Sequence, residues 1–204
     1  MVMGTIFRKL GSDRISSFSY DEIVSATGIV NLYAVRGGAG AESILTPNTT
    51  IQGVSPISGG AVAGGGTSLV TDIDFDLLVN RQVTLKGATI VNFSVQNTQN
   101  TNDIYGIVYV RKWDGATETD LASDQSGTQN LGVEALPFSS YLDIPETVFK
   151  VGEYIRLSVV ITTTSSNTAN IYLAHDPSDS VAISGWTATT SQRITFPMPT
   201  KIVE

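Results

Sequence analysis

The feature that most constrains the fold of this chain is the alternation of polar and apolar residues with a period of two. Residues 72–77, Asp-Ile-Asp-Phe-Asp-Leu, follow this alternation throughout, and residues 154–163 form the longest run rich in β-branched residues. Successive side chains of a β-strand point to opposite faces, so the alternation is typical of strands with one buried face. No segment of ten or more residues shows a competing helical period. The pattern therefore predicts an all-β protein.

Turn-forming residues divide the sequence into short strands. Trp113-Asp114-Gly115 predicts a hairpin turn, and Lys150-Val151-Gly152-Glu153 predicts a second turn. Many short strands with a turn roughly every ten residues are typical of a β-sandwich or barrel. We therefore predict a jelly-roll-like β-sandwich of about eight to ten antiparallel strands. The predicted strands cover residues 29–35, 72–77, 83–95, 104–110, 117–121, 141–148, 154–163, 170–174 and 193–196.

The first 16 residues differ in charge from the rest of the chain. They hold three cations and one acid: Arg8, Lys9, Arg14 and Asp13. The total charge of −7 thus divides into +2 for this arm and −9 for the remainder. Such asymmetry indicates a basic end that docks on an acidic surface, although a solvated terminus is the alternative. We expect a basic N-terminal arm, residues 1–16, and a single β-sandwich domain, residues 17–204.

Residues 37–70 of this domain are rich in glycine. Glycines cluster at residues 37–38, 59–60 and 64–66. Glycine permits unusual backbone conformations, and long loops in compact domains are usually functional or disordered. The composition predicts a long Gly-rich loop with one short strand near Ile44-Leu45.

The composition leaves few residues for catalysis. The sequence has no cysteine and one histidine, His175, which excludes disulfides, thiol nucleophiles, iron–sulfur sites and multi-histidine metal sites. The glycine clusters lack the Gly-Lys-Ser/Thr of a phosphate-binding loop. A strand that runs into an Asp176-Pro177 turn explains His175, whereas a catalytic role would need a serine placed beside it by the fold. We expect that the chain is not an enzyme and that it uses no cofactor.

Neither a nucleic acid nor a membrane is expected as a partner. A net charge of −7 disfavours a surface that binds nucleic acids generally, because such a surface needs a dense field of lysine and arginine. No stretch approaches the roughly 20 apolar residues of a membrane-spanning helix. The first residues carry their cations after a short apolar piece, the reverse of a secretory signal, so synthesis in a cytoplasm is expected.

Asp72, Asp74 and Asp76 are the candidate metal ligands. In a strand they share one face and lie about 7 Å apart, and clustered oxygens suit Ca²⁺. Their spacing lacks the Asn/Asp and Gly pattern of an EF-hand loop. The polar face of a half-buried strand explains them without a metal, and this explanation is the one that we adopt.

Two tryptophans are the candidate aromatic contacts. Trp113 lies beside a predicted turn and is expected to be exposed, and Trp186 is the second candidate. Aromatic rings can stack on sugar rings as well as fill a core. Tyr105 and Tyr109 share one face of a strand with Ile107 between them, which favours a place in the core.

Three stretches of the sequence resemble jelly-roll capsid decoration (cement) proteins and related head or tail accessory proteins of tailed bacteriophages. They are residues 18–33, residues 150–159, Lys-Val-Gly-Glu-Tyr-Ile-Arg-Leu-Ser-Val, and residues 172–177, Tyr-Leu-Ala-His-Asp-Pro. The turn Lys-x-Gly-Glu at residue 150 is also similar to turns of carbohydrate-binding modules.

The resemblance implies a virion structural protein, a capsid decoration or head accessory subunit located in the virion. Its partners would be the major capsid protein or other virion subunits, and copies of itself in a homo-oligomer. The candidate interaction residues are Arg8, Lys9, Arg14, Trp113 and Trp186. The alternatives are a carbohydrate-binding β-sandwich module or a phage fibre or receptor-binding component with a glycan site. A hydrolase on the same sandwich, dependent on His175, is a further hypothesis.

Overall fold

The computed structural model describes residues 28–36, 42–51, 57–62, 66–97, 102–131, 135–165, 169–179 and 191–201. These residues form strands joined by turns and loops, which confirms the all-β prediction. Within them there is no helix with the length and apolar character that crossing a membrane requires. The predicted arm, with Arg8, Lys9 and Arg14, lies outside the described residues, and so does Trp186.

The described part of the chain contains twelve strands, two more than the upper end of the predicted range. β3 and β8 are short and come from stretches without a clear alternation of polar and apolar residues. The strands are β1 Ile29–Arg36, β2 Ser43–Thr46, β3 Ile57–Val62, β4 Gly66–Leu78, β5 Val83–Asn97, β6 Asn102–Trp113, β7 Glu118–Gln125, β8 Gln129–Leu131, β9 Ala135–Phe149, β10 Tyr154–Ser165, β11 Ala169–Leu173 and β12 Ile194–Pro199.

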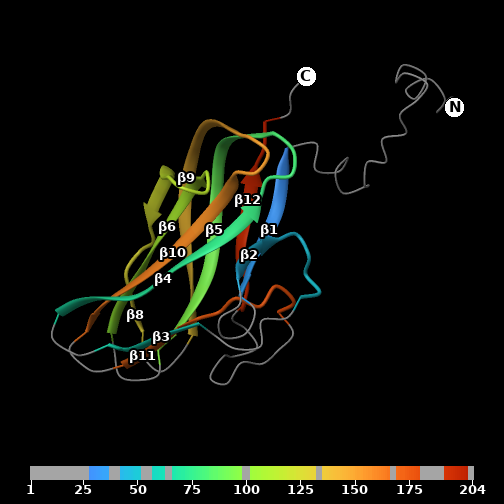
Figure 1. Cartoon of the computed structure of the whole chain (residues 1–204). Helices are drawn as coiled ribbons and strands as arrows, with labels where there is room; N and C mark the ends of the chain where they lie inside the picture. The colour runs from blue at the N-terminus through green and yellow to red at the C-terminus, as the bar shows by residue number, and fades with distance from the viewer. Residues whose placement is uncertain are drawn as a thin grey trace, which may run out of the picture.

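The strands form one hydrogen-bonded sheet that folds into two layers (Figure 1). One layer holds β9, β5, β12, β1 and β2, with β11 and β3 continuing from β5. The other layer holds β7, β6, β10 and β4, with β8 beside β6. Paired strands are antiparallel except β2 and β4, whose one paired position, Ile44 with Asp76, joins the two layers. The architecture is a β-sandwich, as the sequence predicted.

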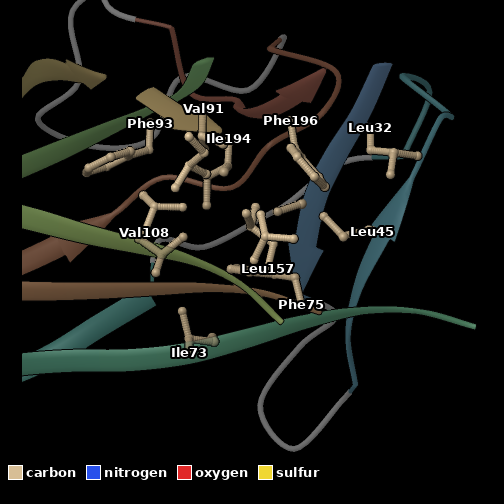
Figure 2. Packing of buried hydrophobic residues seen from close by; sticks show 14 of the residues in the cluster. Leu32, Leu45, Ile73, Phe75, Val91, Phe93, Val108, Leu157, Ile194 and Phe196 are labelled. Carbon is tan, nitrogen blue, oxygen red and sulfur yellow. The ribbon is translucent and has the colours of Figure 1, made fainter. Parts of the chain in front are cut away.

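The core lies between the layers and follows the alternation in the sequence. In β9, for example, Phe138, Leu142 and Ile144 are buried, while Tyr141 and Asp143 between them are exposed. Such burial of one strand face is the main driving force for a sandwich. Figure 2 shows side chains of the two layers pointing toward one another, among them Val91, Phe93, Ile194 and Phe196 from one layer and Ile73, Phe75, Val108 and Leu157 from the other.

The layers approach each other closely at Phe93 and Gly106. The Phe93 ring of β5 stacks on Phe138 of β9, with ring centroids 5.5 Å apart and ring planes 11° apart. A Cβ atom at Gly106 of β6 would come within 2.7 Å of Phe93 Cε2 and closer still to Cζ. Gly106 N–H donates a hydrogen bond to Ser126 Oγ at 2.9 Å, which holds this part of β6 in place. Only glycine leaves room for the phenylalanine ring here.

The predicted hairpin turn joins β6 to β7. Asp114 Oδ1 accepts hydrogen bonds from the N–H groups of Ala116 and Thr117 at 2.8 and 2.6 Å. Gly115 has a φ of 95°, a conformation that residues with a side chain rarely adopt. The sequence therefore predicted both the place of this turn and the residues that stabilise it.

The expected Gly-rich loop at residues 37–70 holds more regular structure than predicted. β2 confirms the short strand expected near Ile44-Leu45. β3 and the first half of β4 also come from this stretch, so its glycines occupy strands as well as connections. Pairing with β11 and β10 supplies the backbone hydrogen bonds that the local sequence does not signal.

The prediction that Tyr105 and Tyr109 face the core is wrong. Both are half-buried on the outward side of β6, whereas Ile104 and Val108 are fully buried. Both faces of this strand are apolar in sequence, so the period of two does not choose between them, and a shift of one residue exchanges the faces. Arg111 shares the face of the tyrosines, and its charge keeps that face outside.

Gly106→Ala is expected to destabilise the fold by about 1–3 kcal/mol, because the new methyl group must displace the Phe93 ring from its stack on Phe138. Urea unfolding followed by tryptophan fluorescence measures the effect. Gly127→Ala is the matched control, since a Cβ there meets nothing within 4 Å. Equal stability of the two variants would contradict this account of the core.

Candidate functional site

A row of four charged side chains crosses the outward face of β4, β10, β6 and β7. The strand register places Asp76 beside Arg156, Arg156 beside Arg111, and Arg111 beside Asp120. Two like charges therefore lie directly opposite each other, which is unfavourable unless carboxylates flank them. We define the Arg156 face as this row and the outward side chains around it, Asp72, Asp74, Tyr109, Trp113, Glu118 and Ser158.

Each arginine is hydrogen-bonded to the carboxylate at its own end of the row, Arg156 to Asp76 and Arg111 to Asp120. Asp76 accepts two parallel hydrogen bonds from Arg156, Nε to Oδ1 at 2.7 Å and Nη2 to Oδ2 at 2.8 Å. Arg111 Nε donates to Asp120 Oδ1 at 2.7 Å. A bidentate pair of a guanidinium and a carboxylate fixes the direction of both side chains as well as attracting them.

Two further carboxylates bridge the arginines. Glu118 Oε1 lies 2.9 Å from Arg156 Nη1, and its Oε2 lies 3.3 Å from Arg111 Nη1. Asp74 lies 3.2 Å from Arg156 Nη1 and 3.8 Å from Arg111 Nη1. Ser158 Oγ–H donates to Asp74, and Arg111 Nη1 donates to Ser158 Oγ at 3.1 Å. Each guanidinium is thus held on several sides, which offsets the repulsion between the two.

Each guanidinium also covers an aromatic ring of β6. Arg111 Cζ lies 4.3 Å from the centroid of Tyr109, and Arg156 Cζ lies 5.0 Å from the centroid of Trp113. Both distances are within the range of cation–π attraction. One face of each ring is therefore occupied by an arginine of the same molecule.

The charges shift the ionisation of two groups on this face. Hydrogen bonding to Asp76, followed by Glu118, raises the pKa of Arg156 above its ordinary value, despite partial burial that acts the other way. Partial burial raises the pKa of Asp72 from its ordinary value of 3.8; Asp74 and Glu118 raise it further, and Arg111 opposes them. Arg156 therefore stays charged, while the surroundings of Asp72 disfavour its anionic form.

Two of the three candidate metal ligands, Asp74 and Asp76, form ion pairs with the arginines. Asp72, Asp74 and Asp76 share the outward side of β4, as predicted, with Ile73 and Phe75 buried between them. No group of three or more His, Cys, Asp or Glu in the described ranges is arranged to hold a metal ion. With five carboxylates and two guanidiniums, the ionised Arg156 face has an excess of negative charge.

The side chains of the Arg156 face are held in place by one another. The side chains of Arg111 and Arg156 are 15% exposed, and each is held by several partners. Ordering such side chains on binding costs little further conformational entropy. Arginine, tryptophan and tyrosine are also the residues that most often dominate the energetics of protein interfaces.

Trp113 is the predicted interaction residue that the structure places on this face. It is half-buried at the end of β6, rather than fully exposed as expected, because Arg156 covers it. The sequence analysis missed Arg111, Arg156 and Glu118. A signal was present, since Arg156 interrupts an apolar run between buried Ile155 and Leu157 and must therefore face outward.

His175 lies away from the Arg156 face. Its side chain is 3% exposed, and its Nδ1 accepts a hydrogen bond from Arg36 N–H at 3.1 Å. The neighbouring Asp176 is fully buried and accepts hydrogen bonds from Ser178 N–H and Oγ–H at 3.1 and 2.7 Å. These contacts support the predicted turn after β11.

Known proteins share the architecture of this chain but not its sequence. The sequence matches no protein-family model, and no curated protein is significantly similar to it. A CocE/NonD family hydrolase from Staphylococcus aureus superposes with a TM-score of 0.51 at 13% identity, over 85% of this chain and 36% of the hydrolase. An α-amino acid ester hydrolase gives a TM-score of 0.48 at 10% identity over the same shares, 85% and 36%. A structure of infectious bursal disease virus, Gx strain, gives 0.34 at 11% identity over 72% and 36%.

The prediction that the chain is not an enzyme is contradicted by the first of these similarities, because the neighbour in fold is a hydrolase. The chain spans about a third of that hydrolase, 36% of its length, so the shared region is one part of a larger protein. Counting catalytic residue types misled the prediction, since a β-sandwich can belong to an enzyme without an evident catalytic set of its own.

A double-mutant cycle of Arg156→Gln and Asp76→Asn is expected to give a coupling energy of about 1 kcal/mol, because the bidentate pair is partly shielded from solvent. Urea unfolding of the four proteins measures it. Lys86 and Glu146, paired at 3.0 Å with side chains 56% and 44% exposed, form the control cycle and are expected to couple less. Equal coupling energies in both cycles would show that the Arg156–Asp76 pair stabilises the fold no more than an exposed ion pair does.

Asp72→Asn is expected to raise the melting temperature at neutral pH. Because the pKa of Asp72 is higher in the folded than in the unfolded chain, its ionisation destabilises the fold at neutral pH, and this cost disappears below its ordinary value of 3.8. The gain in Asp72→Asn should therefore shrink as the pH falls. Thermal unfolding measured from neutral pH down to below pH 3.8 tests whether the melting temperature of Asp72→Asn changes in this direction. The variant Asp143→Asn, at an exposed position, is the control.

Proposed function

We propose that this chain is a structural subunit of a virion that docks on neighbouring subunits through the Arg156 face. The observation that carries the proposal is the fixed arrangement of Arg111 and Arg156 among carboxylates and over two aromatic rings. A partner protein meets donors, acceptors and ring edges that are already in place, so docking orders few side chains. Sugar stacking is less well served, because an arginine covers one face of Trp113.

The virion setting is supported by the resemblance of three stretches to phage capsid decoration and accessory proteins. Charge supports it independently of the fold: the arm at residues 1–16 is basic, whereas the Arg156 face has an excess of carboxylates. Surfaces of opposite charge on neighbouring copies or subunits favour one orientation of docking. A decoration or head accessory subunit, bound to the major capsid protein or another virion subunit, combines these features best.

Incorporation into particles tests this proposal. Trp113→Ala is expected to lower the amount of chain that co-sediments with purified virions at least about tenfold, the effect of losing an interface hot spot. Tyr141→Ala, which removes a 58% exposed ring from the other layer, is the control and should be incorporated normally. Absence of the unmodified chain from virions, or normal incorporation of Trp113→Ala, would overturn the proposal.

A carbohydrate-binding module or receptor-binding component is the second candidate function. It is favoured by the half-buried Trp113 ring with Glu118 and Arg156 beside it, since aromatic rings with nearby charged hydrogen-bonding groups suit sugars. A glycan array distinguishes the two candidates: binding that Trp113→Ala abolishes would favour the glycan site, and an array without any hit would exclude it.

Participation in hydrolysis is the third candidate, and it rests on the shared fold with a hydrolase. In this case the chain would supply a β-sandwich to a larger catalytic unit. Hydrolysis of an activated ester by the full chain, and its loss in His175→Ala with the fold retained, would favour this candidate over docking alone.

A further inference from the structure

A groove opens at the end of the sandwich where the chain enters β1. Its volume is about 880 Å³, and it is lined by residues of the β4–β5 turn, the start of β1 and the last described residues. The walls are mainly apolar, with Val30 and Leu78 as the most accessible side chains, 40% and 45% exposed. Arg81 lies at its rim in the β4–β5 turn.

The groove adjoins a strand edge without a partner in the described part of the chain. β1 pairs with β12 along most of its length, but β2 pairs only with its second half, Tyr33–Arg36. β2 then ends at Thr46, opposite Tyr33, and Pro47 follows. Beside Ile29–Leu32, on the β2 side, the described residues therefore leave the place of one short strand open. An extended peptide can add to such an edge and bury its side chains in the adjoining groove.

We infer that this edge and groove receive residues 17–24 of a second copy of the chain. The inference deepens the proposed function, since it names one contact through which copies of the subunit would hold each other. Residues 17–21, Ser-Phe-Ser-Tyr-Asp, alternate polar and apolar as a half-buried strand does, so Phe18 and Tyr20 would face the apolar walls.

The charges of the donor and the groove are complementary. Asp21 and Glu22 are the two acids of this donor segment. Arg81, at the rim of the groove, has no ion pair with any residue in the described ranges. A carboxylate of the donor would give this guanidinium the partner that it lacks in one copy, and opposite charges favour the correct register.

The donor segment comes just before β1 in the sequence, and the groove lies beside the start of β1. The donor joins β1 at Gly28, whose carbonyl accepts hydrogen bonds from Thr200 N–H and Oγ1–H at 2.5 and 2.6 Å. Residues 17–24 lie 4 to 11 positions before Gly28, so they can extend about 13–36 Å from it, enough to reach the facing end of a neighbouring copy. Two copies placed end to end can therefore each insert the donor segment into the other's groove. Because this exchange has two-fold symmetry, every contact occurs twice.

Cross-linking by engineered cysteines tests this exchange in the full chain, which has no cysteine of its own. Two single variants, Tyr20→Cys with a size tag and Leu78→Cys without one, are mixed and mildly oxidised. The exchange is expected to give a disulfide-linked heterodimer in high yield on a non-reducing gel. Tyr20→Cys mixed with Ile90→Cys, an equally exposed position in β5, is the matched control and should give at least about tenfold less product.

A second arm separates exchange from occupation by the same chain. The double variant Tyr20→Cys with Leu78→Cys is oxidised at low concentration. A disulfide within one chain, together with no heterodimer in the mixture, would overturn the inference, and so would equal yields from Leu78→Cys and Ile90→Cys. Neither outcome tests the Arg156 face, so failure of this inference would not contradict docking through that face.

Reversing the charge of Arg81 gives a further check on the same contact. Arg81→Glu is expected to lower the heterodimer yield by placing a like charge against Asp21 and Glu22. Arg81→Lys, which retains the positive charge, should leave most of the yield unchanged. Equal yields from both variants would contradict the role of charge in the exchange.

Discussion

The fold depends on the close contact between its two layers at Phe93 and Gly106. A sandwich is stable only if the inner faces of both layers exclude water along their whole length. Phe93 fills the space between β5 and β6 because Gly106 has no side chain, and Phe138 supports the ring from its own layer. Ile104 and Val108 of β6 and Leu157 of β10 fill the same space between the layers.

The alternation of buried and outward side chains along β6 and β10 also determines which residues lie on their outer side. Ile155 and Leu157 on either side of Arg156 are buried, and so is Val110 before Arg111, so both arginines lie on the outer face, directly opposite each other. Two adjacent cations on a sheet are tolerated because Asp74 and Glu118 lie between them and bind both. The result is a polar surface with little freedom to rearrange, which suits a partner of fixed shape.

Much of the fold could be predicted from the sequence, and the reasons are visible in particular elements. From Phe138 to Ile144, β9 alternates in burial because its inner face carries mainly apolar side chains there and its outer face is mostly polar. The turn at Asp114 was predictable because its carboxylate caps the backbone of the next residues. The facing of β6 was not, because tyrosines and aliphatic residues alternate there and both faces are apolar.

The sequence by itself determined the all-β class, the inward faces of most strands and the main turns, because each of these follows from local pattern and turn chemistry. It also determined that Asp72, Asp74 and Asp76 share one face. Only the tertiary structure decided that Arg111 and Arg156 lie beside those carboxylates, because strand register joins residues about 80 positions apart. The open edge of β1 is likewise a tertiary feature, since it exists only because β2 ends halfway along its neighbour.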